Sequence, residues 1–292
     1  SNCSIIYGCV YLGNLLRLLN MGVNPDIEIG RRLTERGRFR SVPPFLGAVY
    51  LVRNGKKYGA IGLLQGYFPN KGDSWNYALG QVSRYYKKIA ANLPVYGPPP
   101  DAGSEKTHGR LSGVIGKNCL KMMSLLARRT AEMHLALNSA GRDADFSPEP
   151  FSAAYQRSVS RSMSKLAGSA MELLSLKLKN MPAALLPDAR LVLENKGGIL
   201  KIFLTLSLKK ISAEKIRVHG DFHLGQTLFT GKDFVIIDFE GEPAKALRER
   251  RLKDSPLRDV AGMLRSFHYA ALAPFYLDGG KSAGEMRKMA PW

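Results

Sequence analysis

The chain has 292 residues, a hydrophobic fraction of 45% and a formal net charge of +19 at pH 7. The apolar fraction is ordinary for a globular protein and argues against disorder over the whole length. No apolar run is long enough for a transmembrane helix, and the start of the chain lacks the basic segment and cleavage site of a signal peptide. Three scattered cysteines cannot build a disulfide framework, so a reducing cytoplasm is the expected location. The basic residues are not interleaved with aromatic residues, so neither nucleic acid nor a membrane is an expected partner.

The first part of the chain favours short strands and one helix. Gly8 marks a turn between two apolar runs, and Asn24 is a helix cap that precedes a proline in the first helical turn. Asn54-Gly55 is the strongest short-range signal of a β-hairpin. The expected elements are two strands within 5–19, a helix over 25–36, and a hairpin of 45–53 and 57–65.

Helical patterns dominate the remainder of the chain. A stretch rich in proline and glycine, 94–109, is typical of a surface linker. The expected helices are 75–92, 120–137, 151–181, 185–211 with an interruption at Gly197-Gly198, and 256–272.

Two apolar runs, 215–219 and 234–239, are expected to be short strands on either side of a turn at 231–233. The order of elements predicts an α+β fold with a small β-rich lobe followed by a larger helical lobe. The expected domains are a small lobe and hinge over 1–67, an intermediate helix and loop over 68–109, and a helical lobe over 110–292.

One short segment carries the residue types that phosphoryl transfer requires. Gln226 and Asp238 follow Asp221 by five and seventeen residues, and Asp238 ends an apolar run. Phosphoryl transfer needs a carboxylate that orients the attacking hydroxyl, and oxygen ligands that hold Mg²⁺ against the nucleotide phosphates. Asp221 is therefore the candidate base, and Gln226 and Asp238 are the candidate Mg²⁺ ligands. Glu240 and Glu242 are close enough in sequence to bind the metal through water or to hold the loop.

Other residues around this segment are expected to support it. A Gly-Asp pair alone is common in turns, so the assignment depends on the whole combination. His219 begins the loop that contains the candidate base, and His223 is expected to form a hydrogen bond within that loop. Arg258 and Asp259 begin the last predicted helix, where Asp259 would cap the helix or buttress the loop. His134 is expected to be a structural histidine inside its helix.

Several motifs spread over nearly the whole chain match one family pattern. The loop resembles that of the aminoglycoside phosphotransferase group of protein-kinase-like folds, which reads His-Gly-Asp-x-His-x-x-Asn. Within that group the set is most similar to bacterial maltokinases, which also occur fused to trehalose synthase. The matching segments are 24–30, 42–44, 65–67, 128–136, 219–226, 233–243 and 255–267.

The resemblance implies a bilobal fold and phosphorylation of maltose to maltose 1-phosphate with ATP and Mg²⁺, for α-glucan synthesis, with trehalose synthase as a partner. It implies that Gln65, Gly66 and Tyr67 form the hinge between the lobes, where backbone groups meet adenine. Glu28 would face the lysine that positions the nucleotide in this family. Asn14 holds the place of that lysine here, and its uncharged amide cannot supply the same electrostatic stabilisation.

Two alternatives remain open. A glucosamine- or aminoglycoside-type kinase has the same scaffold, and an amino-sugar acceptor would require carboxylates in its pocket. A catalytically impaired pseudokinase associated with trehalose synthase would agree with Asn14, whereas the intact Asp221, Gln226 and Asp238 favour turnover. Because the family pattern extends beyond both ends of this chain, both lobes are expected to be incomplete.

Overall fold

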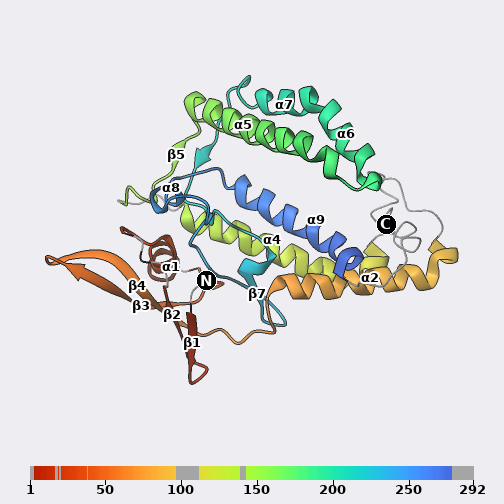
Figure 1. Cartoon of the computed structure of the whole chain (residues 1–292). Coiled ribbons are helices and arrows are strands. Elements are labelled where there is room, and N and C mark those ends of the chain that lie inside the picture. Colours follow the sequence, from red (N-terminus) through yellow and green to blue (C-terminus); the bar gives the residue numbers. More distant parts are fainter. Residues whose placement is uncertain are drawn as a thin grey trace. The chain divides into compact units, whose positions relative to one another are not determined.

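The computed structural model describes residues 3–16, 19, 21–37, 39–96, 112–138 and 143–277. They form two compact units, of which one is the segment Glu149–Lys215 and the other is made by the chain before and after it (Figure 1). The expected α+β class is confirmed, since an antiparallel sheet near the N-terminus is followed by a mainly helical part. Within the described ranges, no helix has both the length and the apolar character that crossing a bilayer requires.

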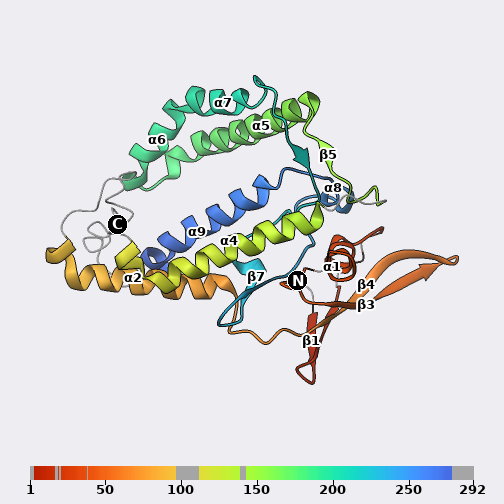
Figure 2. The same cartoon turned by 180° about the vertical axis from the view of Figure 1, so that it is seen from behind.

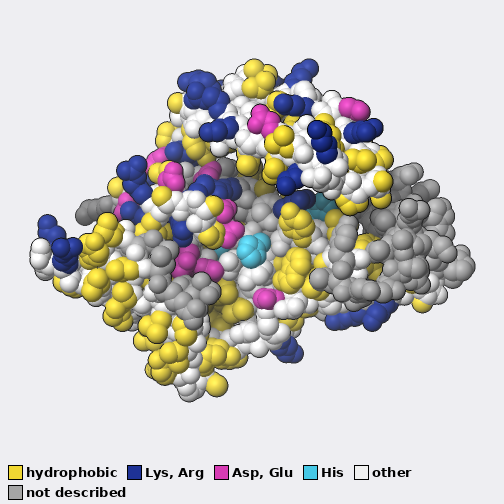
Figure 3. Space-filling model, viewed as in Figure 1, with side chains coloured by type: hydrophobic (Ala, Val, Ile, Leu, Met, Phe, Trp, Pro, Cys, Tyr) yellow, Lys and Arg dark blue, Asp and Glu magenta, His cyan; other side chains and the backbone are white. Residues whose placement is uncertain are grey.

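A four-stranded antiparallel sheet forms the N-terminal part of the larger unit. Its strands in spatial order are β1 (Cys3–Tyr7), β2 (Tyr11–Leu15), β4 (Lys56–Gly66) and β3 (Phe45–Arg53). Asn54 and Gly55 have φ angles of 50° and 73°, as the predicted tight turn between β3 and β4 requires. Ile27 packs against the sheet in a small buried cluster, whereas Tyr7 and Leu15 are exposed, and Figure 3 shows hydrophobic side chains gathered over the sheet.

Helix α1 (Pro25–Glu35) connects the sheet to the helical part. Asn24 caps it as predicted, because its side chain accepts hydrogen bonds from two first-turn amides at 2.9 and 3.2 Å. Ile27 belongs to the cluster under the sheet, while Ile29 and Leu33 belong to the main core. Helix α1 therefore packs on both sides and holds the sheet against the helices.

The main core lies among long helices that surround a short hairpin. The further elements of this unit are α2 (Ser74–Tyr96), α4 (Lys117–Leu137), η3 (Leu224–Gln226), β7 (Thr227–Phe229), β8 (Phe234–Ile236), α8 (Leu247–Arg250) and α9 (Leu257–Leu277). Figures 1 and 2 both show α9 running alongside α2 and α4. Leu126, Met133, Phe222, Phe234 and Met263 are buried together at their centre. Each such side chain contributes about 1.5–3 kcal/mol through its removal from water.

The second unit is a helical segment closed at its base by two short strands. Its elements are β5 (Glu149–Pro150), α5 (Ala153–Lys177), η1 (Leu178–Asn180), η2 (Ala183–Leu185), α6 (Leu186–Glu194), α7 (Lys196–Thr205) and β6 (Glu214–Lys215). Gln156 on α5 is buried and donates to the carbonyls of Leu206 and Lys209, which fixes α5 against the end of α7. The predicted break at Gly197-Gly198 is misplaced, because both glycines lie inside α7 and the helices meet at Asn195.

The prediction of a strand over 215–219 is also wrong beyond its first residue. The backbone of Ile216 bonds on both sides to a single residue, Asp254, at 3.0 and 2.8 Å. The amide of His219 donates to a carboxylate rather than to a strand. The strand β8 exists, but its partner is β7, a three-residue strand that is too short to show a periodic pattern. Most of the predicted linker, 97–109, lies outside the described residues.

Candidate active site

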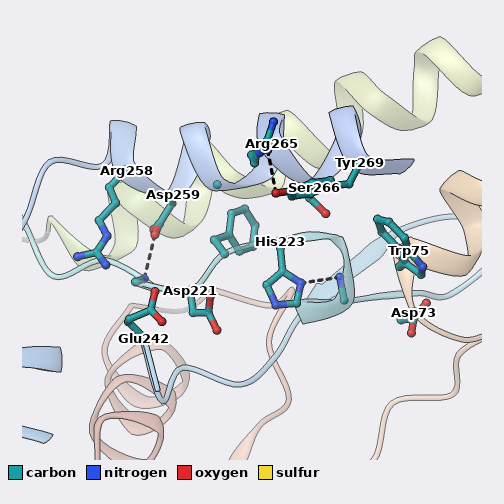
Figure 4. A pocket seen from close by; sticks show the side chains of 14 residues that line it. Asp73, Trp75, Asp221, His223, Glu242, Arg258, Asp259, Arg265, Ser266 and Tyr269 are labelled. Carbon is teal, nitrogen blue, oxygen red and sulfur yellow. Dashed lines mark hydrogen bonds between the residues drawn. The ribbon is translucent and has the colours of Figure 1, made fainter. Parts of the chain in front are cut away.

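Asp259 fixes the start of the candidate catalytic loop. Its two carboxylate oxygens accept hydrogen bonds from the amides of His219 and Gly220, each at 2.9 Å, of which Figure 4 draws the bond from Gly220. His134 bonds to the same carboxylate at 2.9 Å. Burial alone would raise the pKa of the Asp259 carboxyl, but the bond with His134 and the neighbouring His219 and Gly220 keep it below its ordinary value. Asp259 is only 1% exposed, so it acts as an internal anion that orders the loop.

His219 connects this loop to the segment that carries Asp238. Its Nε2 donates to the carbonyl of Ile237 at 2.9 Å, so the proton resides on Nε2. The ring packs against Phe222 and Phe239 at centroid distances of 5.1 and 4.9 Å. Burial lowers the pKa of His219, which is therefore neutral near pH 7.

A cavity of about 620 Å³ opens beside Asp221. Its lining includes the carboxylates of Asp73, Asp221 and Glu242 and the aromatic rings of Trp75 and Tyr269 (Figure 4). The carboxylate of Asp259 also faces it, but that group is already engaged by the loop. Two arginines, Arg258 and Arg265, line the cavity as well, and they are hydrogen-bonded to Asp254 and Tyr269. The carboxylates and the amphipathic rings together are a lining suited to a polar organic molecule that can carry a positive charge.

Tight packing of α9 holds the floor of this cavity in place. A Cβ atom on Gly262 would lie 2.6 Å from the carbonyl oxygen of Phe222, so only glycine allows this approach. The amide of Leu224 donates to the buried hydroxyl of Ser266 at 3.1 Å. His223 accepts a hydrogen bond at Nδ1 from the amide of Gly225 at 3.1 Å, which is a bond within the loop, as the sequence suggested.

A second cavity, of about 460 Å³, lies between the sheet and the segment that carries Asp238, here called the candidate metal-binding segment. Its lining includes Asn14, Asp26, Gln65, Tyr67 and Asp238, and its described lining residues include no lysine or arginine. The predicted hinge thus borders the same cavity as two carboxylates. A triphosphate bound here would require compensating charge from metal ions.

The hinge itself is already hydrogen-bonded within the chain. The amide of Gly66 donates to the carbonyl of Pro44 at 2.8 Å, and the amide of Tyr67 donates to the carbonyl of Val10 at 2.7 Å. A Cβ atom on Gly66 would come within 3.0 Å of the Pro44 ring, so the hinge packs closely there. An adenine in this cavity would meet other backbone groups of the hinge than these two amides.

Asp238 occupies a left-handed backbone conformation. Its φ is 63°, a conformation that is uncommon for residues with a side chain, although aspartate and asparagine adopt it more readily than most. The preceding amide, that of Ile237, donates to the carbonyl of Gln226 at 3.0 Å, so the two candidate Mg²⁺ ligands belong to hydrogen-bonded segments. An amide oxygen and a carboxylate are the donors that Mg²⁺ prefers. Within the described part of the chain no group of three or more histidine, cysteine, aspartate or glutamate side chains is placed to hold a metal. Gln226 and Asp238 would supply two of the six ligands of Mg²⁺ and leave the other positions for phosphate oxygens and water.

The expectation that Glu28 faces the nucleotide site is corrected by the structure. Glu28 forms ion pairs with Arg217 and Arg251 at 2.8 and 2.6 Å instead. On an α-helix, residues two positions apart are rotated by about 200°, so the cavity receives Asp26 and Glu28 points elsewhere. Asn14 does border the cavity, and its Oδ1 accepts a hydrogen bond from the Ser4 hydroxyl at 2.6 Å.

Asp26 makes the stability of the chain depend on pH. Burial raises the pKa of its carboxyl to about 7, and the charges of Asp238 and Glu240 add to this rise, against a hydrogen bond from the amide of Phe239. Because the folded pKa exceeds the unfolded value of about 4, the folded state binds more protons than the unfolded state between these pH values, and stability falls as pH rises through this window.

Replacement of Asp26 by asparagine is therefore expected to remove this loss while it keeps an acceptor for the Phe239 amide. The free energy of unfolding of the wild type, relative to that of Asp26→Asn, should fall by roughly 3 kcal/mol between pH 5 and pH 8. Urea unfolding of both proteins across this range measures the difference. An identical pH dependence in the two proteins would show that Asp26 does not hold a raised pKa.

Four residues that line the cavity beside Asp221 were not identified as site residues from the sequence. Asp73 and Trp75 lie at the start of α2, and Arg265 and Tyr269 lie on α9, where Arg265 donates to the Tyr269 hydroxyl at 2.8 Å. The spacing of Arg265 and Tyr269 by four residues on a predicted helix was the available signal. Arg258 also borders the cavity, although its Nη1 donates to Asp254 at 3.0 Å.

Comparison with known proteins finds similarity to glucosamine kinases. No protein-family model matches the chain. It is 44% identical over 55 residues to the glucosamine kinase of Mycolicibacterium smegmatis (strain ATCC 700084 / mc(2)155), which covers 18% of this chain and 14% of that protein. It is 37% identical over 54 residues to the glucosamine kinase of Streptacidiphilus jiangxiensis, with coverage of 18% and 12%.

Solved structures extend the similarity to the whole fold. A glucosamine kinase in crystal form B aligns with a TM-score of 0.67 and 21% identity over 98% of this chain and 60% of that chain. A glucosamine kinase in complex with glucosamine, ADP and inorganic phosphate aligns with a TM-score of 0.65 and 21% identity over 99% of this chain and 64% of that chain. The chain thus has the kinase-like fold of these enzymes and spans less than two thirds of their length. The similarity does not support maltose as the acceptor.

Proposed function

We propose that this chain carries the phosphotransferase core of an ATP-dependent sugar kinase whose acceptor is an amino sugar of the glucosamine type. One observation supports this most strongly. The candidate base Asp221 borders a cavity rich in carboxylates, and the candidate metal ligand Asp238 borders a second cavity next to the hinge. The bond from His219 to Ile237 holds the two segments together, as transfer between two bound substrates requires.

The roles of the chain's own residues follow from their positions. Asp221 orients the acceptor hydroxyl and takes its proton during transfer. Gln226 and Asp238 would hold Mg²⁺, which neutralises charge on the phosphates of ATP when it is bound. Asp259 and His219 do not touch substrate but fix the loop that carries Asp221. Asp238 borders the cavity in which the nucleotide would bind.

The charge of the acceptor cavity favours an amino sugar over maltose. Asp73 and Glu242 line the cavity in addition to the base, and an amino sugar carries a positive charge near neutral pH. The attraction between a carboxylate and an ammonium group is several-fold stronger at a partly buried site than in bulk water. Maltose is neutral, so its hydroxyls can donate hydrogen bonds to these carboxylates but cannot form an ion pair with them. The main sequence-based expectation thus gives way to its glucosamine-type alternative.

The choice of acceptor is testable with a panel of matched sugars. Purified chain with Mg-ATP is expected to phosphorylate glucosamine in preference to glucose, N-acetylglucosamine and maltose. Glu242→Gln should raise the KM for glucosamine roughly tenfold and leave the KM for glucose unchanged, because only the amine loses an ionic partner. A preference for maltose, or equal effects on both sugars, would contradict the amino-sugar assignment.

Asn14 determines how well the nucleotide site works. A lysine at this position would face the cavity that contains Asp26 and Asp238 and would supply the positive charge that the described lining lacks. Asn14→Lys is expected to raise kcat/KM for ATP about tenfold, because a fixed cation stabilises the charge that develops on the phosphates. Leu15→Lys, one residue further on the same strand and 54% exposed, is the matched control and should change nothing.

The same measurement separates the enzyme from a pseudokinase. Transfer by the wild-type chain, improved by Asn14→Lys, agrees with a working but weakened kinase. ATP binding with no transfer to any sugar, in the wild type and in Asn14→Lys alike, would support a nucleotide-binding module without turnover.

A further inference from the structure

Glu28 on helix α1 is held by two arginines of the helical part. Arg251 binds it through two nitrogens, with Nε at 3.0 Å from Oε2 and Nη2 at 2.6 Å from Oε1. Arg217 approaches Oε2 through Nη2 at 2.8 Å. The side chain of Glu28 is only 12% exposed, so these ion pairs are largely shielded from solvent. Removing one member of such an ion pair destabilises the fold strongly, because the other charge is left buried without a partner.

Arg217 is the largest of the fully buried side chains, with 1% exposure. Its guanidinium lies 5.1 Å from the centroid of the Phe146 ring, and Arg32 of α1 lies at the same distance from that ring. The 2.8 Å contact with Glu28 is ionic rather than a well-aligned hydrogen bond, since the same nitrogen has no partner of good geometry among the described residues. Glu28 therefore acts mainly as the countercharge that allows Arg217 to be buried.

Arg217 lies immediately before the candidate catalytic loop. It precedes His219 by two residues and Asp221 by four. Its neighbour Ile216 is fixed by the two backbone bonds to Asp254, and the amide of His219 is fixed by Asp259. Through the ion pair of Glu28 with Arg217, helix α1 thus contacts the residues that come immediately before the loop.

Helix α1 also holds the candidate metal-binding segment. The carboxylate of Asp26, two residues before Glu28, accepts the amide of Phe239 at 2.9 Å, directly after Asp238. One short helix therefore contacts the segment before the base and the segment of the metal ligand. Their relative position depends on α1 as a common support.

We propose that Glu28 and Arg217 are positioning residues, which set the catalytic loop against the candidate metal-binding segment through helix α1. Glu28 thus acts on the catalytic loop through Arg217, outside the nucleotide cavity. It does not pair with a lysine inside that cavity, which is the arrangement that the family pattern suggests. The inference rests on the proposed function, because it assigns the pair a role in phosphoryl transfer. Small displacements of a reacting group cost up to about 100-fold in rate.

Glu28→Gln and Glu35→Gln form a matched pair of variants. Both remove one charge from an ion pair of α1, but Glu35 is 46% exposed and pairs with Arg31 at the surface. Glu28→Gln is expected to lower kcat roughly 10- to 100-fold with little change in the KM values for ATP and sugar, whereas Glu35→Gln should behave as the wild type. Hydrogen–deuterium exchange in 217–226, measured without turnover, should be faster in Glu28→Gln and unchanged in Glu35→Gln.

The double variant Glu28→Gln with Arg217→Met separates positioning from stability, and it remains informative if Glu28→Gln alone does not fold. Removing both charges should return the thermal midpoint towards that of the wild type, because Arg217 is then no longer a buried unpaired charge. Arg251 is 26% exposed and keeps its contact with Asp145 at 3.3 Å. We expect kcat to stay low and exchange in 217–226 to stay fast. The proposal would be overturned if kcat and the exchange rate in 217–226 returned to wild-type values together with the thermal midpoint. Unchanged exchange in Glu28→Gln would also overturn it. A wild-type chain without sugar kinase activity would instead refute the proposed function, while the exchange data still decide whether the pair positions the loop.

Discussion

Replacement of Asp221 by asparagine is expected to lower kcat for sugar phosphorylation by at least about 100-fold, within the 10²- to 10⁴-fold range of general base catalysis. The amide has the same shape as the carboxylate but cannot take the proton of the acceptor hydroxyl. Asp221 borders the acceptor cavity and is followed by a loop that backbone bonds hold in place, so the variant should fold normally. Steady-state kinetics with Mg-ATP, together with calorimetric ADP binding, measure both properties.

Asp73→Asn is the matched control for this variant. Asp73 lines the same cavity and caps α2 through a 2.8 Å bond from the amide of Asn76, and asparagine also makes such a cap. We expect its effect on the KM for an amino sugar and not on kcat. A kcat for Asp221→Asn close to that of the wild type would remove Asp221 from the role of base.

Replacement of Asp259 by alanine is expected to destabilise the fold by about 3–5 kcal/mol. The change leaves the amides of His219 and Gly220 without their acceptors and removes the partner of His134, all in a buried place. Each orphaned buried donor costs about 1–3 kcal/mol. Asp259→Asn retains one acceptor oxygen and should lose less. Urea unfolding at pH 7 measures the difference.

Asp254→Asn provides the comparison for this prediction. Its carboxylate pairs with Arg258 at a partly exposed site, so the expected loss is within about 1 kcal/mol. Equal destabilisation by Asp254→Asn and Asp259→Ala would show that the loop does not depend on the buried carboxylate in particular.

The sequence predicted those parts of the fold that are determined by residues close together in the chain. The Asn54-Gly55 turn, the Asn24 cap and the long helices were all visible in the sequence, because turn geometry, capping and helical periodicity are local properties. The strand β7 was missed, since three residues cannot show a period, and its pairing with β8 is a property of the folded chain.

The candidate site shows the same division. The spacing of Asp221, Gln226 and Asp238 predicts a phosphotransferase loop, whereas the presence of Asp26 rather than Glu28 in the second cavity depends on the rotation of α1. Trp75 and Tyr269 come together only through the packing of α2 beside α9, which no local pattern specifies. The expected acceptor, maltose, is not supported by the comparisons, and the catalytic loop alone carries little information about the cavity beside it.

Transfer of labelled γ-phosphate from ATP to glucosamine in the presence of Mg²⁺ is the decisive measurement for an amino-sugar kinase. We expect labelled glucosamine phosphate with the wild-type chain and at least about 100-fold slower labelling with Asp221→Asn. Binding of ATP without transfer to any sugar, or transfer to maltose alone, would contradict the proposed function.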